Sequence, residues 1–311
     1  CAEKSRLQSL GTEAVMMAIR LARAYTSKTK IIKFDDHFHG WSDYATAGGS
    51  GLGGIPQETL DTMIVLPPND IDLVEKTIKK SGDVAAVMIE PTGSHMGLHP
   101  IPPSFLHELR ELTERTGTIF HMDEVVTGFR LSKGGASVKF EVTPDVTTLA
   151  KILGGGMPGG AVAGKSDIIN LIEFQDDASY NQNERVGHPG TFNANPISAA
   201  AGAKALELVR DTDVNEKADA AAAKLKNALN ELLGKMEIAG QVTGHGSLLF
   251  VRLGVDFEVG SDGASFELTD SEWETVNNGQ RNSQIHLALL NEGIDPMSNG
   301  TRLIIGQDHS D

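Results

Sequence analysis

The fold of this chain is decided by the stretch Thr147-Thr148-Leu149-Ala150-Lys151-Ile152-Leu153-Gly154-Gly155-Gly156-Met157-Pro158. Lys151 stands between apolar neighbours at the end of a predicted buried strand, directly before a run of glycines. Burial disfavours the ammonium form and lowers the pKa of a lysine, which suits an amine that forms a Schiff base. The glycines let backbone approach a ligand. A lysine at a strand end can equally extend to solvent, so this stretch alone leaves both interpretations open.

On either side of this stretch, short apolar runs alternate with helical patterns. Strands are predicted at Lys30–Phe34, Met63–Leu66, Val84–Glu90, Thr118–Val125, Thr147–Leu153 and Ala161–Gly164. Helices are predicted at Thr12–Tyr25, Asp70–Lys80, Pro103–Thr116 and Asp167–Phe174. Several strands are continuous apolar runs, which is typical of a sheet covered on both faces. The pattern predicts an α/β fold with a mostly parallel sheet between helices.

The sequence pattern changes after Pro196. Helices are predicted at Ile197–Arg210, Val214–Met236 and Ser283–Asn291, a β-like region at Leu248–Leu253 and a loop at Gly254–Gly279. We therefore expect a large domain over residues 1–207 and a smaller C-terminal α+β domain over residues 208–311.

The amino-acid composition limits the classes of partner that the chain can bind. The 311 residues include 42 acidic and 27 basic side chains, for a net charge of −15, which argues against nucleic-acid or anionic-membrane partners. The single cysteine, Cys1, excludes an intrachain disulfide, and neither a membrane-length apolar run nor a signal-peptide pattern occurs. We expect a cytoplasmic protein. Both ends look cut, at Cys1 and at Asp311.

Asp123 is a second candidate, because it follows another apolar run and ligands of open α/β sheets bind at the carboxyl ends of strands. A carboxylate there can pair with a protonated pyridine nitrogen. The alternative is an acid that caps a helix or pairs with Arg130. Gly11-Thr12 opens a predicted helix whose free N–H groups suit a phosphate, or else forms a plain glycine turn with a threonine N-cap.

Taken in order, these segments resemble the class III, fold-type I pyridoxal-phosphate family, in its glutamate-1-semialdehyde 2,1-aminomutase-like branch. The resemblance is carried by Gly11-Thr12-Glu13-Ala14, His39-Gly40, Asp123 to Arg130, Thr148 to Lys151 with Gly154 to Pro158, and Gly190 to Pro196. It implies a large fold-type I domain and pyridoxal 5'-phosphate as cofactor.

The resemblance also implies residue roles. Lys151 forms the Schiff base and shuttles protons, and Asp123 pairs with the pyridine nitrogen. Val125 packs on one ring face and Phe38 stacks on the other. The remaining cofactor contacts are Gly11 and Thr12 at the phosphate, His95 near the ring hydroxyl, and Thr191 at the phosphate of a neighbouring subunit, so that a homodimer is expected.

Two departures bear on activity. Leu10 stands where relatives usually have serine, which removes a hydroxyl from the phosphate site. Relatives also extend upstream, where part of the substrate pocket lies, and past residue 311. Three functions therefore stay open: an aminomutase acting on one semialdehyde, an aminotransferase acting on two amino and keto substrates, and an inactive fragment that binds cofactor without turnover.

Two further patterns are set aside. Gly49-Ser50-Gly51-Leu52-Gly53-Gly54 spells a dinucleotide fingerprint, which needs a strand before it and a helix after it. Here Ile55-Pro56-Gln57 follows and leads towards another predicted strand, so a mobile loop over the active site is expected instead. His37 and His39 lack a third nearby metal ligand, and we expect turn residues that help position the cofactor, with no metal. His188 is expected in a loop near the subunit interface.

Overall fold

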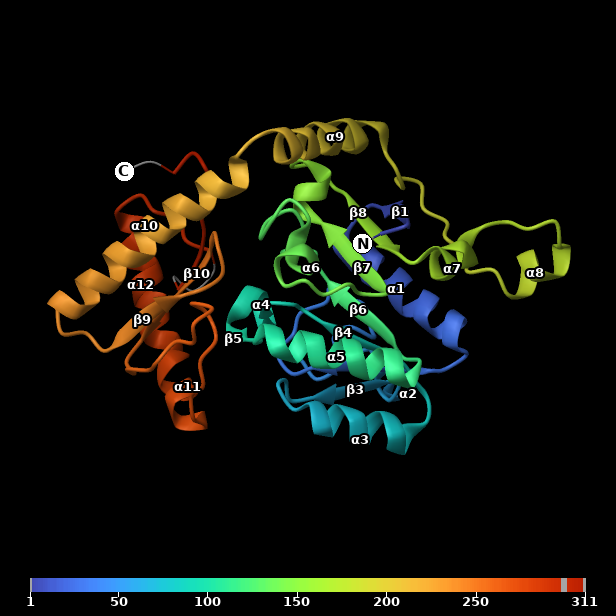
Figure 1. The fold of residues 1–311 in the computed structure, drawn as a ribbon, viewed down its shortest axis with the longest axis horizontal. Helices are drawn as coiled ribbons and strands as arrows, with labels where there is room; N and C mark the ends of the chain where they lie inside the picture. Colours follow the sequence, from blue (N-terminus) through green and yellow to red (C-terminus); the bar gives the residue numbers. More distant parts are fainter. Residues whose placement is uncertain (1, 298–300, 310–311) are drawn as a thin grey trace. The chain divides into compact units, whose positions relative to one another are not determined.

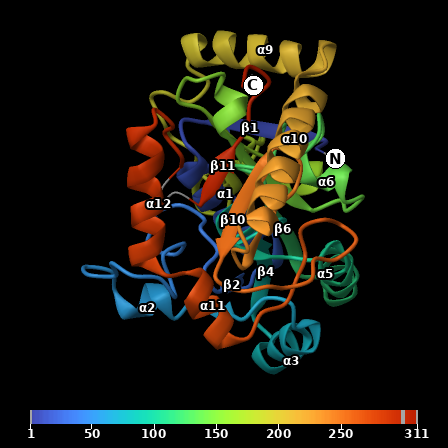
Figure 2. The same cartoon turned by 90° about the vertical axis from the view of Figure 1, so that its left-hand side faces the viewer.

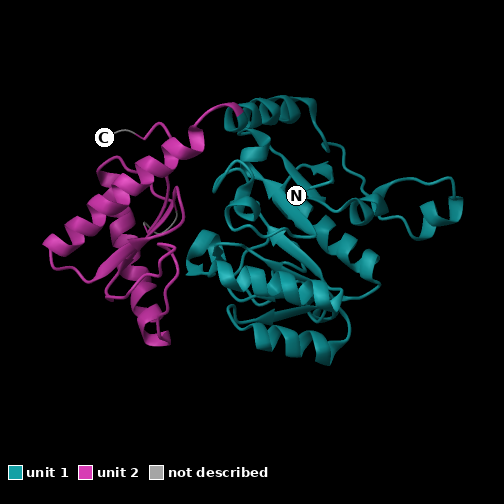
Figure 3. Ribbon diagram, in the orientation of Figure 1, with its two compact units in different colours: residues 1–210 teal, residues 211–311 magenta. Residues whose placement is uncertain are grey.

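The computed structural model describes residues 2–297 and 301–309, so Cys1 lies outside the described part. The chain divides into two compact units, Cys1–Arg210 and Asp211–Asp311 (Figure 3). Each unit is described by itself below.

The large unit is built on one sheet. Its seven described strands run in the order β1-β8-β7-β6-β4-β2-β3 (Figure 1). Their bounds are β1 Lys4–Gln8, β2 Lys30–Phe34, β3 Met63–Leu66, β4 Val84–Ile89, β6 Ile119–Asp123, β7 Val146–Ala150 and β8 Gly160–Gly164. From β3 to β7 all neighbours are parallel, whereas β8 is antiparallel to both β7 and β1. The predicted mostly parallel sheet is confirmed.

Helices cover both faces of this sheet. Helix α1 (Gly11–Thr26) packs on β4, β6, β7 and β8. On the other face lie α5 (Pro103–Thr116), whose Phe105 meets Phe34 of β2 edge-on at 5.6 Å, and α3 (Ile71–Ser81) beside it. In Figure 2 the strands β2, β4 and β6 lie between α1 and α5.

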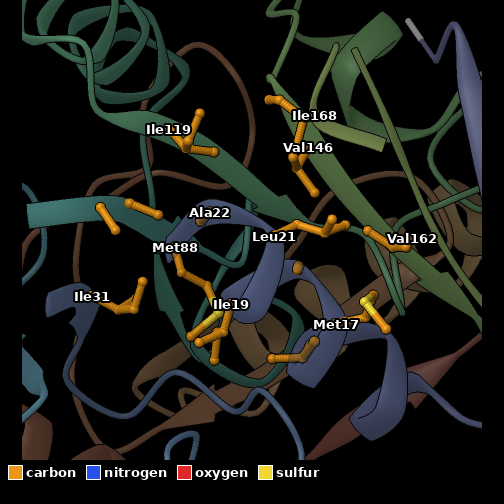
Figure 4. Packing of buried hydrophobic residues seen from close by; sticks show 14 of the residues in the cluster. Met17, Ile19, Leu21, Ala22, Ile31, Met88, Ile119, Val146, Val162 and Ile168 are labelled. Atoms are coloured by element: carbon orange, nitrogen blue, oxygen red, sulfur yellow. The ribbon is translucent and has the colours of Figure 1, made fainter. Parts of the chain in front are cut away.

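The core beneath α1 explains why this helix forms where it does. Its apolar residues recur at helical spacing and place Met17, Ile19 and Leu21 against strand residues that include Met88 and Val146 (Figure 4). Burial of these side chains stabilises the helix against the sheet and thereby fixes where Gly11 begins it.

The remaining elements of the large unit are short connections and one long helix. They are α2 Gln57–Leu60, α4 Ser94–Gly97, β5 His99–Pro100, α6 Gly135–Lys139, η1 Lys151–Gly154, α7 Ser166–Ile169, η2 Asn170–Ile172, α8 Ala178–Asn183 and α9 Pro196–Asp211.

The small unit pairs three described strands with helices. The antiparallel order is β11-β10-β9, with β9 Gly240–Thr243, β10 Leu248–Leu253 and β11 Arg302–Ile304. The helices are α10 Val214–Lys235, α11 Asp270–Val276 and α12 Gly279–Asn291. Ala222 of α10 packs with Val242, Leu249 and Ile305 in its core.

Several of the predicted helix and strand bounds are wrong, and some elements were not predicted. Strand β1 was not predicted, because the sequence KSRLQ is polar and its side chains are mostly exposed at the sheet edge. The predicted strand Thr147–Leu153 ends at Ala150, and the predicted helix Asp167–Phe174 is α7 followed by η2. The predicted loop Gly254–Gly279 contains α11, whose capping box of Thr269 and Glu272 is the sequence signal that was missed.

Candidate active site

Four neighbouring parallel strands deliver polar side chains to one edge of the sheet. His37, Phe38 and His39 follow β2, Glu90 follows β4, Asp123 ends β6 and Lys151 follows β7. Because β2, β4, β6 and β7 are parallel, their carboxyl ends meet at the same edge, where α/β proteins bind ligands. The two predicted residues thus lie at the carboxyl ends of adjacent strands, Asp123 as the last residue of β6 and Lys151 directly after β7.

Asp123 is buried and held by three hydrogen bonds. Its Oδ2 atom lies 2.7 Å from His39 Nδ1, and its Oδ1 accepts bonds from the Thr148 hydroxyl at 3.0 Å and the Val125 N–H at 3.1 Å. Burial alone would raise the pKa of Asp123, but the hydrogen bonds from His39 and from the Val125 N–H oppose this effect, and the pKa is lowered. Asp123 is therefore an ionised carboxylate that is shielded from solvent.

A second histidine supports this carboxylate from the same strand. His121 Nε2 lies 3.1 Å from the Thr148 hydroxyl, which itself donates to Asp123. Burial lowers the pKa of His121 to about 4, so the ring is neutral and its Nε2–H donates to Thr148. A chain of donors thus runs from His121 through Thr148 to Asp123.

His39 is fully buried, and burial lowers its pKa, although the bond and the charge of Asp123 act in the opposite direction. The neutral ring donates Nδ1–H to Asp123. Its Nε2 atom is buried and has no hydrogen-bond partner among the described residues, as is also true of His37 Nε2. A buried polar atom without a partner is costly, whether an acceptor, as at His39 Nε2, or a donor, as at His37 Nε2, and this indicates that a bound group belongs nearby.

Lys151 begins η1 with a left-handed backbone, φ +48°. The lysine was expected to be buried at a strand end, but it follows the strand and is exposed. Its ammonium makes no hydrogen bond or ion pair with the described residues. Burial of part of the side chain lowers its pKa, while the nearby carboxyl groups of Asp123 and Glu90 act in the opposite direction. Lys151 is thus an accessible amine beside a buried carboxylate.

The start of α1 forms a cradle with little room. A Cβ atom on Gly11 would lie 3.1 Å from both Cγ atoms of Val125 and 3.4 Å from Ala150 Cβ. Gly40 has φ +90°, and a Cβ there would lie 2.5 Å from Thr12 Oγ1. These glycines are needed for close approach of backbone segments.

The same helix start carries free donors. The N-cap residue is Leu10, not Thr12 as in the alternative weighed above, and no side chain caps the helix. The first N–H groups of α1 and its dipole are therefore available to an anion.

Phe38 and His95 come from different loops and stack on each other, with ring centroids 5.9 Å apart and planes inclined by 20°. Phe38 is 57% exposed, so its outer surface is accessible to a ligand.

Thr191 is the expected residue that the structure does not bring to this cluster. It is exposed in the segment before α9, and it makes no hydrogen bond to the cluster residues.

The glycines that follow Lys151 allow two backbone segments to pack closely, in addition to any role beside a ligand. Gly155 leaves no room for a side chain beside the backbone of Ala201, and Gly202 none beside Leu153, so α9 packs directly on η1.

Sequence reasoning missed Glu90 and Thr148 as members of the site. Glu90 carries a signal that could have revealed it, because it directly ends the apolar run of β4 and precedes Pro91. Gly49–Gly54 lies in turns and bends before the short helix α2, and it does not directly follow a strand as a dinucleotide fingerprint requires.

The site residues fit pyridoxal phosphate, the cofactor that the resemblance implies. An uncapped helix start suits its phosphate, a buried carboxylate suits its ring nitrogen, and an accessible amine suits its aldehyde. Among the residues of ranges 2–297 and 301–309, no group of three His, Cys, Asp or Glu side chains could hold a metal ion. No helix in the described part is long and apolar enough to cross a membrane.

Known proteins resemble this chain over most or all of its length. A model of the aminotransferase class-III family matches residues 1–294. The chain is 36% identical over its full length to a glutamate-1-semialdehyde 2,1-aminomutase of Sulfurisphaera tokodaii, of which it covers 72%. Over 79% of its length it is 40% identical to one of Desulfotalea psychrophila, of which it covers 58%.

A solved structure, an omega-transaminase from Sphaerobacter thermophilus, superimposes with a TM-score of 0.82 at 34% identity, covering 99% of this chain and 70% of that one. The chain therefore spans roughly three fifths to seven tenths of the length of these relatives.

Proposed function

Because this chain belongs to the class-III aminotransferase family, we propose that it transfers amino groups with pyridoxal 5'-phosphate held at Lys151. The observation that carries the proposal is the placement of Lys151 and Asp123 at the carboxyl ends of adjacent parallel strands, β7 and β6. The start of α1 lies beside them, with Gly11 against Ala150 and Val125.

Pyridoxal phosphate, when bound, supplies an aldehyde that condenses with amines and a ring that withdraws electrons. The Lys151 amine anchors the cofactor and, once displaced by the substrate amine, moves a proton at the substrate carbon. Asp123 holds a negative charge against the ring nitrogen, and His39 and Thr148 keep that carboxylate ionised and oriented. The N–H groups at Gly11 and Thr12 hold the phosphate, while Val125 and Phe38 cover the two ring faces.

Within this family we propose a glutamate-1-semialdehyde 2,1-aminomutase-like activity, because both curated relatives above carry that name. The second candidate is a two-substrate aminotransferase, favoured by the likeness to an omega-transaminase. Single-substrate turnover separates them. Formation of 5-aminolevulinate from the semialdehyde alone supports the aminomutase, and turnover that requires a separate amine donor supports the aminotransferase.

A third candidate is a chain that binds the cofactor without turnover, motivated by Leu10 at the helix start. The decisive experiment compares visible spectra of the wild-type chain and Lys151→Ala with added pyridoxal phosphate, before and after borohydride. We expect a cofactor band that becomes covalently attached only when Lys151 is present. Equal labelling of the variant would refute the role of Lys151, and a colourless wild-type chain would refute cofactor binding altogether.

We also propose a homodimer in which Thr191 reaches the phosphate of the neighbouring site, supported by its exposure and by the family resemblance. Mixing Lys151→Ala with Thr191→Ala chains tests this arrangement. A mixed dimer contains one site with both residues intact, so activity should partly recover. Absence of recovery, although sedimentation shows mixed dimers, would contradict it. A cytoplasmic location belongs to the same proposal and is testable by cell fractionation.

A further inference from the structure

Glu90 is a buried carboxyl group that none of the steps above uses. It follows β4 at the edge of the sheet that carries Asp123 and Lys151, and it is 6% exposed. Its Oε1 atom accepts the N–H of Phe38 at 2.7 Å and the N–H of His95 at 3.1 Å, and its Oε2 accepts the N–H of Met96 at 3.3 Å. One side chain therefore satisfies backbone donors of two separate loops.

The loop after Glu90 contains two residues in an unfavourable backbone conformation. His95 and Met96 have φ values of +47° and +75°, a left-handed conformation that non-glycine residues rarely adopt in succession. Such a conformation persists only where surrounding contacts impose it. The two carboxyl oxygens of Glu90 supply that constraint, because each accepts an N–H from one of these strained residues.

The loop after β2 is held by the same residue twice. The Glu90 carboxyl accepts the Phe38 N–H, and the Glu90 backbone N–H donates to His37 Nδ1 at 3.0 Å. The rings of Phe38 and His95 then stack, although 57 positions separate the two residues in the chain. The side chains of His99 and Asp36 also link these two segments, with Nε2 and Oδ2 3.4 Å apart. Glu90 bonds to the backbone of both segments beside the two rings, so we expect the stacking to depend on it.

We infer that Glu90 is a positioning residue that sets the Phe38 and His95 rings as one wall of the cofactor pocket, by holding the two loops that carry them. The inference rests on the proposed function for the identity of the ligand. The constraint on the loops themselves does not depend on a ligand.

Residue-resolved amide hydrogen exchange of the full chain without cofactor tests the constraint. In Glu90→Ala the amides of Phe38, His95 and Met96 should exchange roughly tenfold faster or more, since each loses a buried acceptor. Glu90→Gln keeps one oxygen and replaces the other with a donor. It should retain protection at Phe38 and His95 while losing it at Met96, or the reverse if the amide is flipped.

Asp145→Asn provides a matched control. Asp145 is also buried and accepts a backbone N–H, that of Phe120 at 2.8 Å, but it lies before β7, at the end of the strand opposite Lys151. This variant should lower the melting temperature without changing exchange at Phe38, His95 or Met96.

Equilibrium binding of pyridoxal phosphate then separates positioning from general stability. We expect Glu90→Ala to bind the cofactor at least roughly tenfold more weakly than Asp145→Asn of similar melting temperature, with partial rescue in Glu90→Gln. Unchanged amide exchange in Glu90→Ala would overturn the inference, as would cofactor binding equal to that of the control. If the wild-type chain does not bind the cofactor, the proposed function fails, and the exchange data still decide whether Glu90 holds the loops.

Discussion

His39 Nδ1 lies 2.7 Å from Asp123 Oδ2, and both side chains are almost completely buried. The bond joins the loop after β2 to the end of β6, so the carboxylate expected to face the cofactor ring is supported from a strand that is not its neighbour. Removal of this hydrogen bond is the most direct test of how His39 supports the charge of Asp123.

His39→Ala should weaken cofactor binding and turnover by about 10- to 100-fold, the usual value of a buried bond to a charged group. Without the His39 donor the pKa of Asp123 rises, because that bond is what most opposes the effect of burial. The measurements are cofactor affinity and kcat/KM. His107→Asn on the exposed side of α5 is the control, and equal losses in both variants would count against the role of His39.

Gly11→Ala should weaken cofactor binding and cost about 1 kcal/mol of stability or more. The added Cβ would lie 3.1 Å from both Val125 methyl groups, closer than ordinary packing allows, so Val125 or the helix start must shift. Calorimetry and cofactor titration measure the two effects. Gly53→Ala is the matched control, since nothing lies within 4 Å of a Cβ there, and it should behave as wild type.

The stability of the chain should fall between pH 4.5 and about 8 because of Glu90. Burial raises the pKa of Glu90 from 4.5 to about 8, and Asp123 adds to this, whereas the three backbone N–H donors act in the opposite direction. In that window the folded carboxyl keeps its proton while the unfolded one loses it. Unfolding then releases a proton, and stability decreases as pH rises.

Glu90→Gln should flatten this part of the profile, as measured by urea unfolding at several pH values. The stabilisation by Asp145, which Asp145→Asn removes, has the opposite dependence on pH. Burial alone would raise the pKa of Asp145, but its bonds to Arg110 and Lys165 lower it, so its stabilisation is lost as pH falls. A profile in Glu90→Gln that parallels wild type above pH 4.5 would disprove the assignment.

In the small unit, Arg252→Ala should cost about 3–5 kcal/mol, as expected for truncation of a large, fully buried side chain. The guanidinium lies 4.5 Å from the Phe266 ring centroid and 5.0 Å from that of Phe250, and Nε donates to Thr243 Oγ1 at 3.0 Å. Burial lowers its pKa to about 9.

Urea unfolding followed by Trp273 fluorescence, in a Trp41→Phe background, measures this effect. Lys235→Ala on the exposed surface of α10 is the control and should change stability by less than about 0.5 kcal/mol. A loss of similar size in both variants would show that Arg252 does not support the unit.

Elements whose burial leaves a local pattern of apolar residues could be predicted from the sequence. The strands Lys30–Phe34 and Met63–Leu66 and the helix Pro103–Thr116 have the predicted bounds, because burial of a strand or of one helix face leaves a local pattern in the sequence. The motifs around Lys151 and Asp123 were likewise visible as residues at the ends of apolar runs, and these lie together because parallel strands end at one edge.

Features that depend on residues far apart in the chain could not be predicted and appear only in the folded protein. The polar strand β1 exists because β8 pairs with it, and its own residues carry no apolar pattern. The bonds of Asp123 to His39 and of Glu90 to Phe38 join different strands of the sheet. No periodicity encodes such pairs, because their energy arises from burial and hydrogen bonding that exist only once the strands lie side by side.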